Sequence, residues 1–458
     1  MRTAASSAPA RRPRSASLAA VRAGAMLAGC ASLLCGCAIY HSKPLPSASD
    51  LARSPVLTVS AASLGVPGLK PEPLDPANGL NEMNVVTLAV VGNPRLKAAR
   101  LQAGVAQAQL FAAGLLPDPQ LSGGMEKSSY LTGYTAAIAE EIQALVTRGA
   151  AVAAARAYRK QVNLEILWQE WQVAQQARTL YIAARANARL QSVLDRRRKL
   201  LWRLYLRDEA AVQRRFVTVG TATVDYDAWS SAEAEWRAFE LKENATRHAL
   251  DELLGLAPGV RLRLRGKPAP QLVDASQYRS ALAALPHRRP DLLALRAGYR
   301  SAEERLREAI LAQFPLISAG VYKTQDAEEG IPIIGFNVNL ALPLFNRNRG
   351  PIAIGRASRA YLHQAYQARL DETVSQVDEI RGAAAIMRRE LAHLESRRTA
   401  RREAAAAARR DLHRGTFSLS DYARVQSGVL SIEAQVIELG ASLEQTQAAL
   451  ATLLALPF

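Results

Sequence analysis

The sequence is poor in cysteine, in aromatic residues and in long apolar runs. Its three cysteines, Cys30, Cys35 and Cys37, lie close together, and none occurs after residue 37. This distribution excludes a disulfide framework, and it argues against metal–thiolate or cysteine-nucleophile chemistry. Aromatic residues make up 6% of the chain against 49% hydrophobic residues, with Ala, Leu and Arg dominant. That mixture favours long helices over an aromatic-rich β core.

Residue patterns of an enzyme are also lacking. The histidines are scattered, without the spacing to cysteine or paired carboxylates that metal ligands show; they are His41, His248, His287, His363, His393 and His413. No glycine-rich loop that could hold a phosphate is present. We therefore expect no enzymatic activity, no cofactor and no metal site.

The net charge of +17 invites comparison with nucleic-acid-binding proteins. Part of this charge lies ahead of a predicted cleavage site, in Arg2, Arg11, Arg12, Arg14 and Arg22. The other arginines alternate with glutamates along helical stretches and form no basic block with aromatic residues. Nucleic acid is therefore not expected as a partner.

The first residues have the layout of a secretory signal, with a basic start followed by a short apolar run over residues 23–36. The end of this run resembles a lipoprotein signal, in which a small residue precedes a cysteine that becomes lipidated. The stretch L-A-G-C ending at Cys30 fits best by letter, whereas L-C-G-C ending at Cys37 leaves a fuller apolar run. An ordinary cleaved signal with incidental cysteines is the alternative.

No run of eighteen apolar residues follows the signal, so no transmembrane helix is expected. If the mature chain crosses a bilayer, it must do so by strands closed into a β-barrel, because unpaired amides are too costly in lipid.

The mature chain contains two copies of one plan. The pattern P-x-L-x-A-x-R occurs at residues 94–100 and again 196 residues later, at 290–296. Three further landmarks recur at offsets of 195 to 198; they are Pro117 and Pro315, Gly220 and Gly415, and the Asp-Tyr pairs that begin at Asp225 and Asp421. We infer a tandem duplication that is divided near the linker at residues 255–270.

Each copy is predicted to contain a helix, a strand pair, a very long helix, a break and a further helix. Period-2 alternation after Pro315 and over residues 334–342 predicts two strands, and Asn residues on one face with large apolar residues on the other suit a barrel strand. Residues 120–127 and 133–142 are weaker candidates in the first copy. A half-buried soluble hairpin is the alternative for all four strands.

The long helices are predicted at residues 150–207 and 353–413, where proline is absent and glycine nearly so. At 1.5 Å per residue the first would span roughly 87 Å. Its apolar residues recur at three- and four-residue spacing, as in Trp168, Trp171, Ala174 and Ala177. This spacing predicts coiled-coil packing.

Four strands per chain cannot close a barrel, since about eight is the smallest number that does. If the strands lie in a membrane, several copies of the chain must therefore pool them. Two copies would supply eight strands and three copies twelve, and the sequence alone does not determine the number of copies.

Two groups of motifs resemble the TolC-like outer membrane factor family. The first is N-P-x-L-x-A-A-R at residues 93–100 with G-L-L-P-D-P-Q-L-S at 114–122. The second is R-P-D-L at residues 289–292 with L-P-L-F-N-R-N-R-G at 342–350, and the latter stretch is similar to the branch that serves heavy-metal resistance-nodulation-division pumps. The resemblance covers residues 83 to 456.

The resemblance implies a mainly α-helical chain with a small membrane β part. Three chains would form a homotrimer, with a twelve-stranded β-barrel in the outer membrane and a periplasmic α-helical barrel. The implied partners are outer-membrane lipid, a periplasmic adaptor and an inner-membrane pump of the resistance-nodulation-division type. We favour lipidation at Cys37, with Cys30 as the alternative, because residues 38–45 are similar to the family's mature start.

The resemblance also implies functional roles for the two helix breaks, which would form a periplasmic tip. There the adaptor would dock, at turns that contain Gly220, Thr223, Gly415 and Ser418. We expect the two glycines to permit the chain reversal and Thr223 and Ser418 to cap the returning helices.

The pore would close at the same tip, and its expected gate residues are Asp421, Arg424 and Asp225. Asp421 lies six residues after Gly415, where the family has an acid facing the lumen, and would form a ring of three carboxylates. Arg424 replaces a second expected acid, and would add either a positive ring or a salt bridge. Alternatively, the two acids only favour the helix dipole.

The sequence therefore predicts an exported channel subunit of a tripartite efflux system, although it names no cargo. The exit duct of a type I protein-secretion system and a periplasmic coiled-coil scaffold remain alternatives. The predicted divisions are a signal peptide at residues 1–36, an extended segment at 37–82, a first repeat at 83–256, a linker at 257–282 and a second repeat at 283–458.

Overall fold

The computed structural model describes residues 40–55, 66, 69, 78–129, 132–267, 275–325 and 330–457. The chain divides into two units, residues 1–50 and residues 51–458. Residues 40–50 of the first unit contain no helix or strand. The predicted signal peptide, with Cys30 and Cys37, lies outside the described residues.

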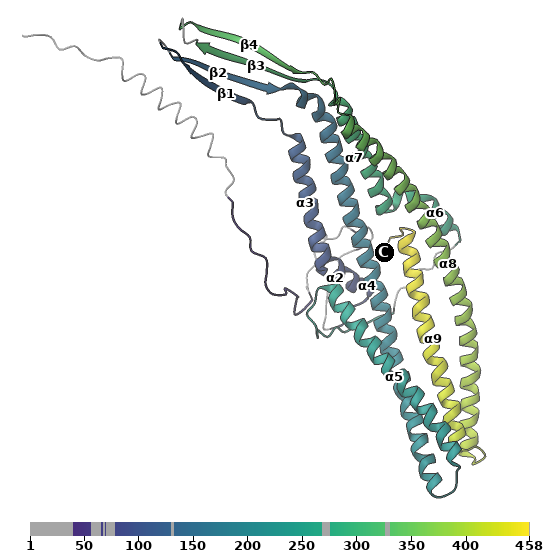
Figure 1. Cartoon of the computed structure of the whole chain (residues 1–458). Coiled ribbons are helices and arrows are strands. Elements are labelled where there is room, and N and C mark those ends of the chain that lie inside the picture. The colour runs from purple at the N-terminus through teal and green to yellow at the C-terminus, as the bar shows by residue number, and fades with distance from the viewer. Residues whose placement is uncertain are drawn as a thin grey trace, which may run out of the picture. The chain divides into compact units, whose positions relative to one another are not determined.

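The second unit contains every described helix and strand (Figure 1). The first repeat runs through α2 (Glu82–Gly92), α3 (Pro94–Gly114), β1 (Gln120–Lys127), β2 (Thr132–Glu141), α4 (Ile142–Gln213) and α5 (Val219–Leu254). The second repeat runs through α6 (Ala275–Arg288), α7 (Pro290–Leu311), β3 (Leu316–Gln325), β4 (Pro332–Ala341), α8 (Arg349–His413) and α9 (Leu419–Leu453). The predicted order of strand pair, very long helix, break and further helix is therefore confirmed in each repeat. Two helices precede the strands where one was predicted, and α6 begins inside the predicted linker.

The long helices exceed their predicted lengths. Helix α4 has 72 residues and α8 has 65. Helix α4 alone is about 108 Å long at 1.5 Å per residue. It starts at Ile142, directly after the last residue of β2, so the first long helix is continuous with a strand.

The four strands form one antiparallel sheet in the order β1-β2-β3-β4. Each repeat contributes a hairpin, and β2 pairs with β3 across the repeats, with Ile138 opposite Val321. Strands β1 and β4 are the two edges. The weak strand predictions of the first repeat are confirmed to within one residue.

Helix contacts follow a definite order within this unit. Helix α4 packs on α3 and α5 on one side and on α7 and α9 on the other, and α7 and α9 pack in turn on α8. The sheet lies at one end of the helices, and the α4–α5 and α8–α9 turns lie at the other (Figure 1).

The largest buried cluster joins α2, α4 and α5 about midway along the helices. The predicted apolar spacing of α4 provides its centre, because Ala174, Ala177 and Tyr181 are all fully buried and Trp171 nearly so. Small alanines at these positions let the helices approach closely, as coiled-coil packing requires. Among the described residues, no helix is both long and apolar enough to cross a membrane.

Candidate functional site

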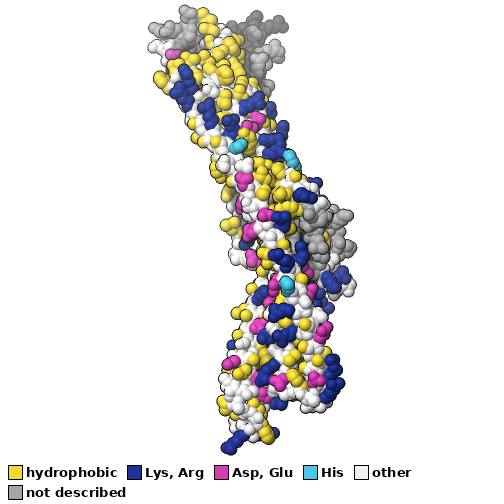
Figure 2. Space-filling model, turned by 90° about the vertical axis from the view of Figure 1, so that its right-hand side faces the viewer, with side chains coloured by type: hydrophobic (Ala, Val, Ile, Leu, Met, Phe, Trp, Pro, Cys, Tyr) yellow, Lys and Arg dark blue, Asp and Glu magenta, His cyan; other side chains and the backbone are white. Residues whose placement is uncertain are grey.

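One face of the sheet is apolar and exposed. A single row of paired residues crosses all four strands, from Leu121 through Ile138 and Val321 to Phe336. Leu121 is 81% exposed and Phe336 67%. Along β4, Ile334, Val338 and Leu340 share the face of Phe336, because side chains alternate between the faces of a strand, and all three are exposed. Hydrophobic side chains gather at this end of the unit (Figure 2).

The opposite face is mostly polar or small, with Ile333 of β4 as an apolar exception. The side chains of Thr135 and Thr324 form a hydrogen bond of 3.0 Å across β2 and β3, and Asn339 donates to Ser318 at 3.4 Å across β3 and β4. A sheet with one exposed apolar face and one mostly polar face suits a surface between lipid and water.

The α8–α9 turn has the geometry that its glycine predicts. Gly415 has φ +75°, in the left-handed region that side chains rarely adopt. Ser418 begins α9 as its N-cap, and its hydroxyl accepts a hydrogen bond of 3.0 Å from the backbone N–H of Asp421. The expectations for Gly415 and Ser418 are therefore confirmed as local geometry.

The expectations for Gly220 and Thr223 are wrong. Gly220 lies inside α5 with no positive φ, and a Cβ there would meet only Thr218 Oγ1, at 3.8 Å. The residue that reverses the chain is Arg215, with φ +61°. Thr218 is the N-cap of α5, and its hydroxyl accepts from the backbone N–H of Thr221.

Gly220 and Gly415 are not equivalent positions in the two repeats. The two turns have the same backbone pattern at an offset of 200 residues, so Arg215 corresponds to Gly415 and Thr218 to Ser418. At the matching position Thr221 occupies the place of Asp421, and Asp225 has no counterpart at the second turn.

The three predicted gate residues do come together near the tip, in an ion-pair cluster. The Arg424 guanidinium donates to both carboxylate oxygens of Asp225, at 3.1 and 3.2 Å, and to Asp421 at 3.3 Å. The side chain of Asp225 is 1% exposed, that of Arg424 41% and that of Asp421 53%. The salt-bridge alternative for Arg424 is therefore the one observed in the single chain.

Two residues that sequence reasoning missed complete this cluster. Asp208 of α4 is 2% exposed, and Ser420 of α9 donates to its carboxylate at 3.3 and 3.4 Å. Burial and a hydrogen bond to Asp208 raise the pKa of Asp225, although Arg424 acts in the opposite direction. The available signal was Asp208 itself, an acid in the apolar three- and four-residue spacing that includes Leu201 and Leu204.

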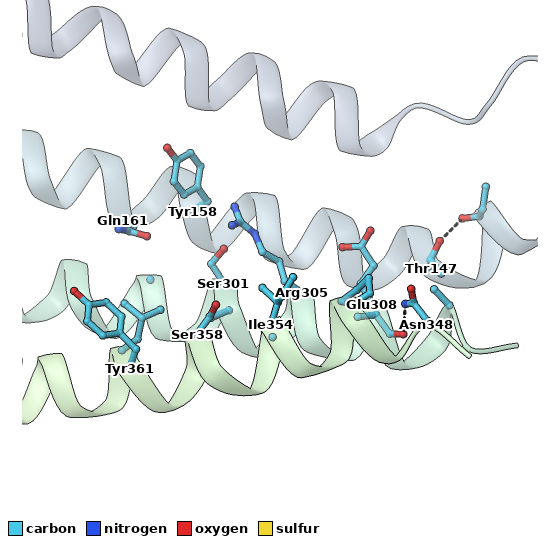
Figure 3. A pocket seen from close by; sticks show the side chains of 18 of the residues that line it. Thr147, Tyr158, Gln161, Ser301, Arg305, Glu308, Asn348, Ile354, Ser358 and Tyr361 are labelled. Atoms are coloured by element: carbon cyan, nitrogen blue, oxygen red, sulfur yellow. Dashed lines mark hydrogen bonds between the residues drawn. The ribbon is translucent and has the colours of Figure 1, made fainter. Parts of the chain in front are cut away.

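A hollow of about 910 Å³ lies just below the sheet, between α4, α7 and α8 (Figure 3). Arg305 and Glu308 of α7 reach into it, and Tyr158 of α4 and Tyr361 of α8 line its walls. The guanidinium of Arg305 lies 5.6 Å from the ring centre of Tyr158. Burial raises the pKa of Glu308, and Arg305 opposes that shift. None of the predicted site residues lines this hollow.

In the part of the chain that the structure describes, no group of three His, Cys, Asp or Glu residues could hold a metal ion.

Residues 281–456 match the family model described as outer membrane efflux protein. This region is nearly the whole of the second repeat. A comparison with curated proteins gave no match.

Several solved structures of membrane proteins, some of them outer-membrane channels, have a similar fold. The outer membrane protein VceC of Vibrio cholerae is 16% identical, with a TM-score of 0.67 over 82% of this chain and 96% of its own. The CmeC outer membrane channel of Campylobacter jejuni is 14% identical, with a TM-score of 0.67 over 92% of this chain and 95% of its own. CusC, whose study concerns transmembrane channel formation, is 14% identical, with a TM-score of 0.67 over 88% of this chain and 99% of its own. At these identities the likeness establishes the fold.

Proposed function

We propose that this chain, whose second repeat carries the outer membrane efflux protein region, is the outer-membrane channel subunit of a tripartite efflux system. In this role it is a passive duct for substrates that an inner-membrane pump delivers through a periplasmic adaptor. The observation that carries the proposal is that an amphipathic four-stranded sheet lies at one end of two very long helices, of 72 and 65 residues, which follow its hairpins in the chain. An efflux channel moves its cargo without chemical change, so no enzymatic activity is assigned.

The open edges of this unit support assembly into a closed ring. Strands β1 and β4 each have one unpaired edge, which is untenable in lipid. The outermost helices are α3 and α5 on the side of β1, and α8 on the side of β4. Joining β4 of one copy to β1 of the next therefore also joins α8 to α3 and α5. Three copies would close twelve strands, a number in the range of known barrels.

The outermost helices carry a second stripe that suits this closure. On α3 and α5 the stripe faces away from α4 and is exposed. Its residues recur every three or four positions on α3 and every seven, three or four positions on α5; they are Ala98, Leu101, Val105, Ala108 and Ala112 on α3 and Val224, Ser231, Ala238, Leu241 and Ala245 on α5. Small exposed residues form the matching stripe on α8, away from α9; they are Ala357, Ala368, Ser375, Gly382, Ala385, Ala392, Ser396 and Ala406. Helices with two such stripes can pack against a neighbour on each side.

Membrane extraction followed by native mass spectrometry tests this assembly. We expect a trimer in the outer-membrane fraction. Leu241→Arg adds a charge to the exposed stripe and should dissociate the trimer, while Asn244→Arg, on a neighbouring flank of α5, should leave it intact. A monomer in the soluble periplasmic fraction would refute the channel proposal.

We further propose that the tip cluster is the closed gate and that the two turns are the adaptor docking site. The support is the position of Asp421, Arg424 and Asp225 at the helix ends far from the sheet. In a trimer the three Asp421 carboxylates would form a ring that favours cations. Asp421→Ala should raise single-channel conductance in planar bilayers or reduce block by multivalent cations. Unchanged values of both would remove Asp421 from the gate.

Lipidation at Cys37 remains part of the proposal. Acyl chains on this cysteine would add a second attachment to the membrane, at about 0.8 kcal/mol per buried methylene. Metabolic labelling with a fatty acid tests it, since Cys37→Ser should abolish the label and Cys30→Ser should not. The opposite result would assign the anchor to Cys30.

The proposed partners are a periplasmic adaptor and a resistance-nodulation-division pump of the heavy-metal type. The support is the L-P-L-F-N-R-N-R-G stretch at residues 342–350. Sensitivity of a deletion strain to a panel of metal salts and drugs tests the branch. Loss of resistance to drugs alone would refute the heavy-metal assignment.

A further inference from the structure

The loop between β4 and α8, residues 342–348, has no counterpart in the first repeat. There β2 ends at Glu141 and α4 begins at Ile142, without a connecting residue. The loop exposes three large apolar side chains, with Leu342 62% exposed, Leu344 63% and Phe345 93%. Neither the channel nor the gate accounts for them.

Hydrogen bonds hold this loop in a definite conformation. The backbone N–H of Leu344 donates to the carbonyl of Leu342 at 2.9 Å, and that of Arg349 donates to Asn346 at 3.0 Å. The Asn348 side-chain amide donates to the carbonyl of Ala309 on α7 at 2.7 Å. Arg347 and Asn348 have φ of +47° and +52°, so the loop turns sharply before α8 begins.

The apolar side chains of this loop continue the apolar face of the sheet. Leu342 has the same parity as Phe336, Val338 and Leu340, so it extends their stripe beyond the end of β4. From Ile334 to Leu342 the stripe measures about 26 Å along the strand, close to the height of the apolar band of membrane barrels. Phe345 lies just past the lower limit of this band.

Two arginines follow directly. Arg347 and Arg349 are exposed, and neither forms an ion pair with any described residue. Lys and Arg side chains gather immediately below the hydrophobic end of the unit on the face that Figure 2 shows. The apolar side chains of Leu344 and Phe345, followed by the guanidinium groups of two arginines, match the order of acyl chains and phosphates in a phospholipid leaflet.

We propose that the 342–349 segment is a membrane-interface anchor that inserts Leu344 and Phe345 among acyl chains and binds phospholipid phosphates with Arg347 and Arg349. Its occupant is the leaflet at the helical end of the sheet. The proposal rests on the proposed function, because it requires the sheet to lie in the membrane. Packing of Phe345 against a neighbouring copy is the alternative that the experiment must separate.

Fluorescence of a tryptophan at position 345 tests the insertion. The five natural tryptophans all lie in α4 and α5, and Trp168, the one nearest the sheet in α4, is about 39 Å down the helix from Ile142. Full-length Phe345→Trp trimer is placed in phosphatidylcholine vesicles that carry a nitroxide near the headgroup. Phe216→Trp, at an 80% exposed position in the tip turn, is the matched control.

The quencher should clearly reduce the added emission of Phe345→Trp, because a residue at the headgroup boundary lies near the nitroxide, and should leave that of Phe216→Trp unchanged. An unquenched Phe345→Trp in an inserted trimer would refute the anchor and assign the side chain to a subunit contact. A protein that fails to insert or to form a trimer would instead refute the proposed function, so the two failures are distinguishable.

Lipid retention in native mass spectrometry tests the arginines. The Arg347→Gln/Arg349→Gln trimer should lose its preference for phosphatidylglycerol over phosphatidylcholine, by about fivefold per arginine. Arg409→Gln/Arg410→Gln, an exposed pair near the tip, is the control and should keep the preference. Equal retention by both double variants would refute phosphate binding by the loop.

Discussion

Removing the guanidinium of Arg424 should loosen the tip of the helices. Arg424→Ala leaves the 1%-exposed carboxylate of Asp225 without its bidentate partner. Breaking a fully buried pair costs about 3–5 kcal/mol and breaking an exposed one about 0–1 kcal/mol. Because Arg424 itself is 41% exposed, we expect a loss between these limits, about 2 kcal/mol.

Hydrogen–deuterium exchange measures this loss locally. A free-energy change of about 2 kcal/mol corresponds to exchange about thirtyfold faster in the last turns of α4 and the first turns of α5 and α9. Exchange around the large cluster of α2, α4 and α5 should not change, because that cluster lies far from the tip. Arg409→Ala, which removes an exposed arginine without an ion pair among the described residues, is the control.

A double-mutant cycle decides whether the pair itself is responsible. If it is, Asp225→Ala combined with Arg424→Ala should cost clearly less than the two single changes added together. Additive effects, or exchange in Arg424→Ala equal to that of the control, would show that the tip is held by other contacts.

Three further changes test the local geometry. Asp208→Asn should stabilise the tip near neutral pH, because an asparagine amide can donate a hydrogen bond to the Asp225 carboxylate, whereas a carboxyl group at position 208 must first bind a proton. The raised pKa of Asp225 makes the natural protein lose stability as pH rises from the pKa of Asp225 in the unfolded chain toward its pKa in the folded protein. The variant should lose less stability over this window, as measured by hydrogen exchange at several pH values. Gly415→Ala should destabilise the protein by about 1 kcal/mol in thermal unfolding, because Gly415 has a positive φ, whereas Gly220→Ala inside α5 should be neutral or stabilising. Equal effects of the two substitutions would contradict the assignment of the chain reversal to Gly415 and Arg215. Arg289→Ala should strongly reduce the yield of folded protein, because the fully buried guanidinium of Arg289 forms a bidentate ion pair with Asp291 and lies 4.7 Å from the Trp168 ring centre. A normal yield and melting temperature would contradict a structural role for Arg289.

The repeated architecture was predictable because it rests on local patterns. Strand β4 alternates large apolar residues with Gly and Asn, and the long helices contain almost no Pro or Gly, so the period of the strand and the approximate extent of the helices were predictable from the sequence. The helices begin earlier than predicted because Gly149, Gly350 and Pro351 lie inside their first few turns. Strands β1 and β2 were harder to predict because Gly123, Gly124 and alanines weaken the alternation. Their partners in the sheet, rather than their own propensity, stabilise them.

The tip cluster was less predictable because its contacts are not local. Arg424 and Asp225 are 199 residues apart, and Asp208 belongs to a third helix. The turn in the first repeat was misassigned because Arg215 adopts a left-handed conformation that a search for glycine overlooks. A polar residue within an apolar spacing, as at Asp208, is the better indicator of such a cluster.

The pairing of β2 with β3 has a consequence for how the chain folds. These strands belong to different repeats, with Tyr134 opposite Gln325, so the sheet joins residues nearly two hundred positions apart. Closing so long a loop is slow relative to forming the local helical hairpins α4–α5 and α8–α9. We therefore expect the helices to form first and the sheet last. This order would delay the exposure of the apolar face of the amphipathic sheet until the chain has reached the membrane.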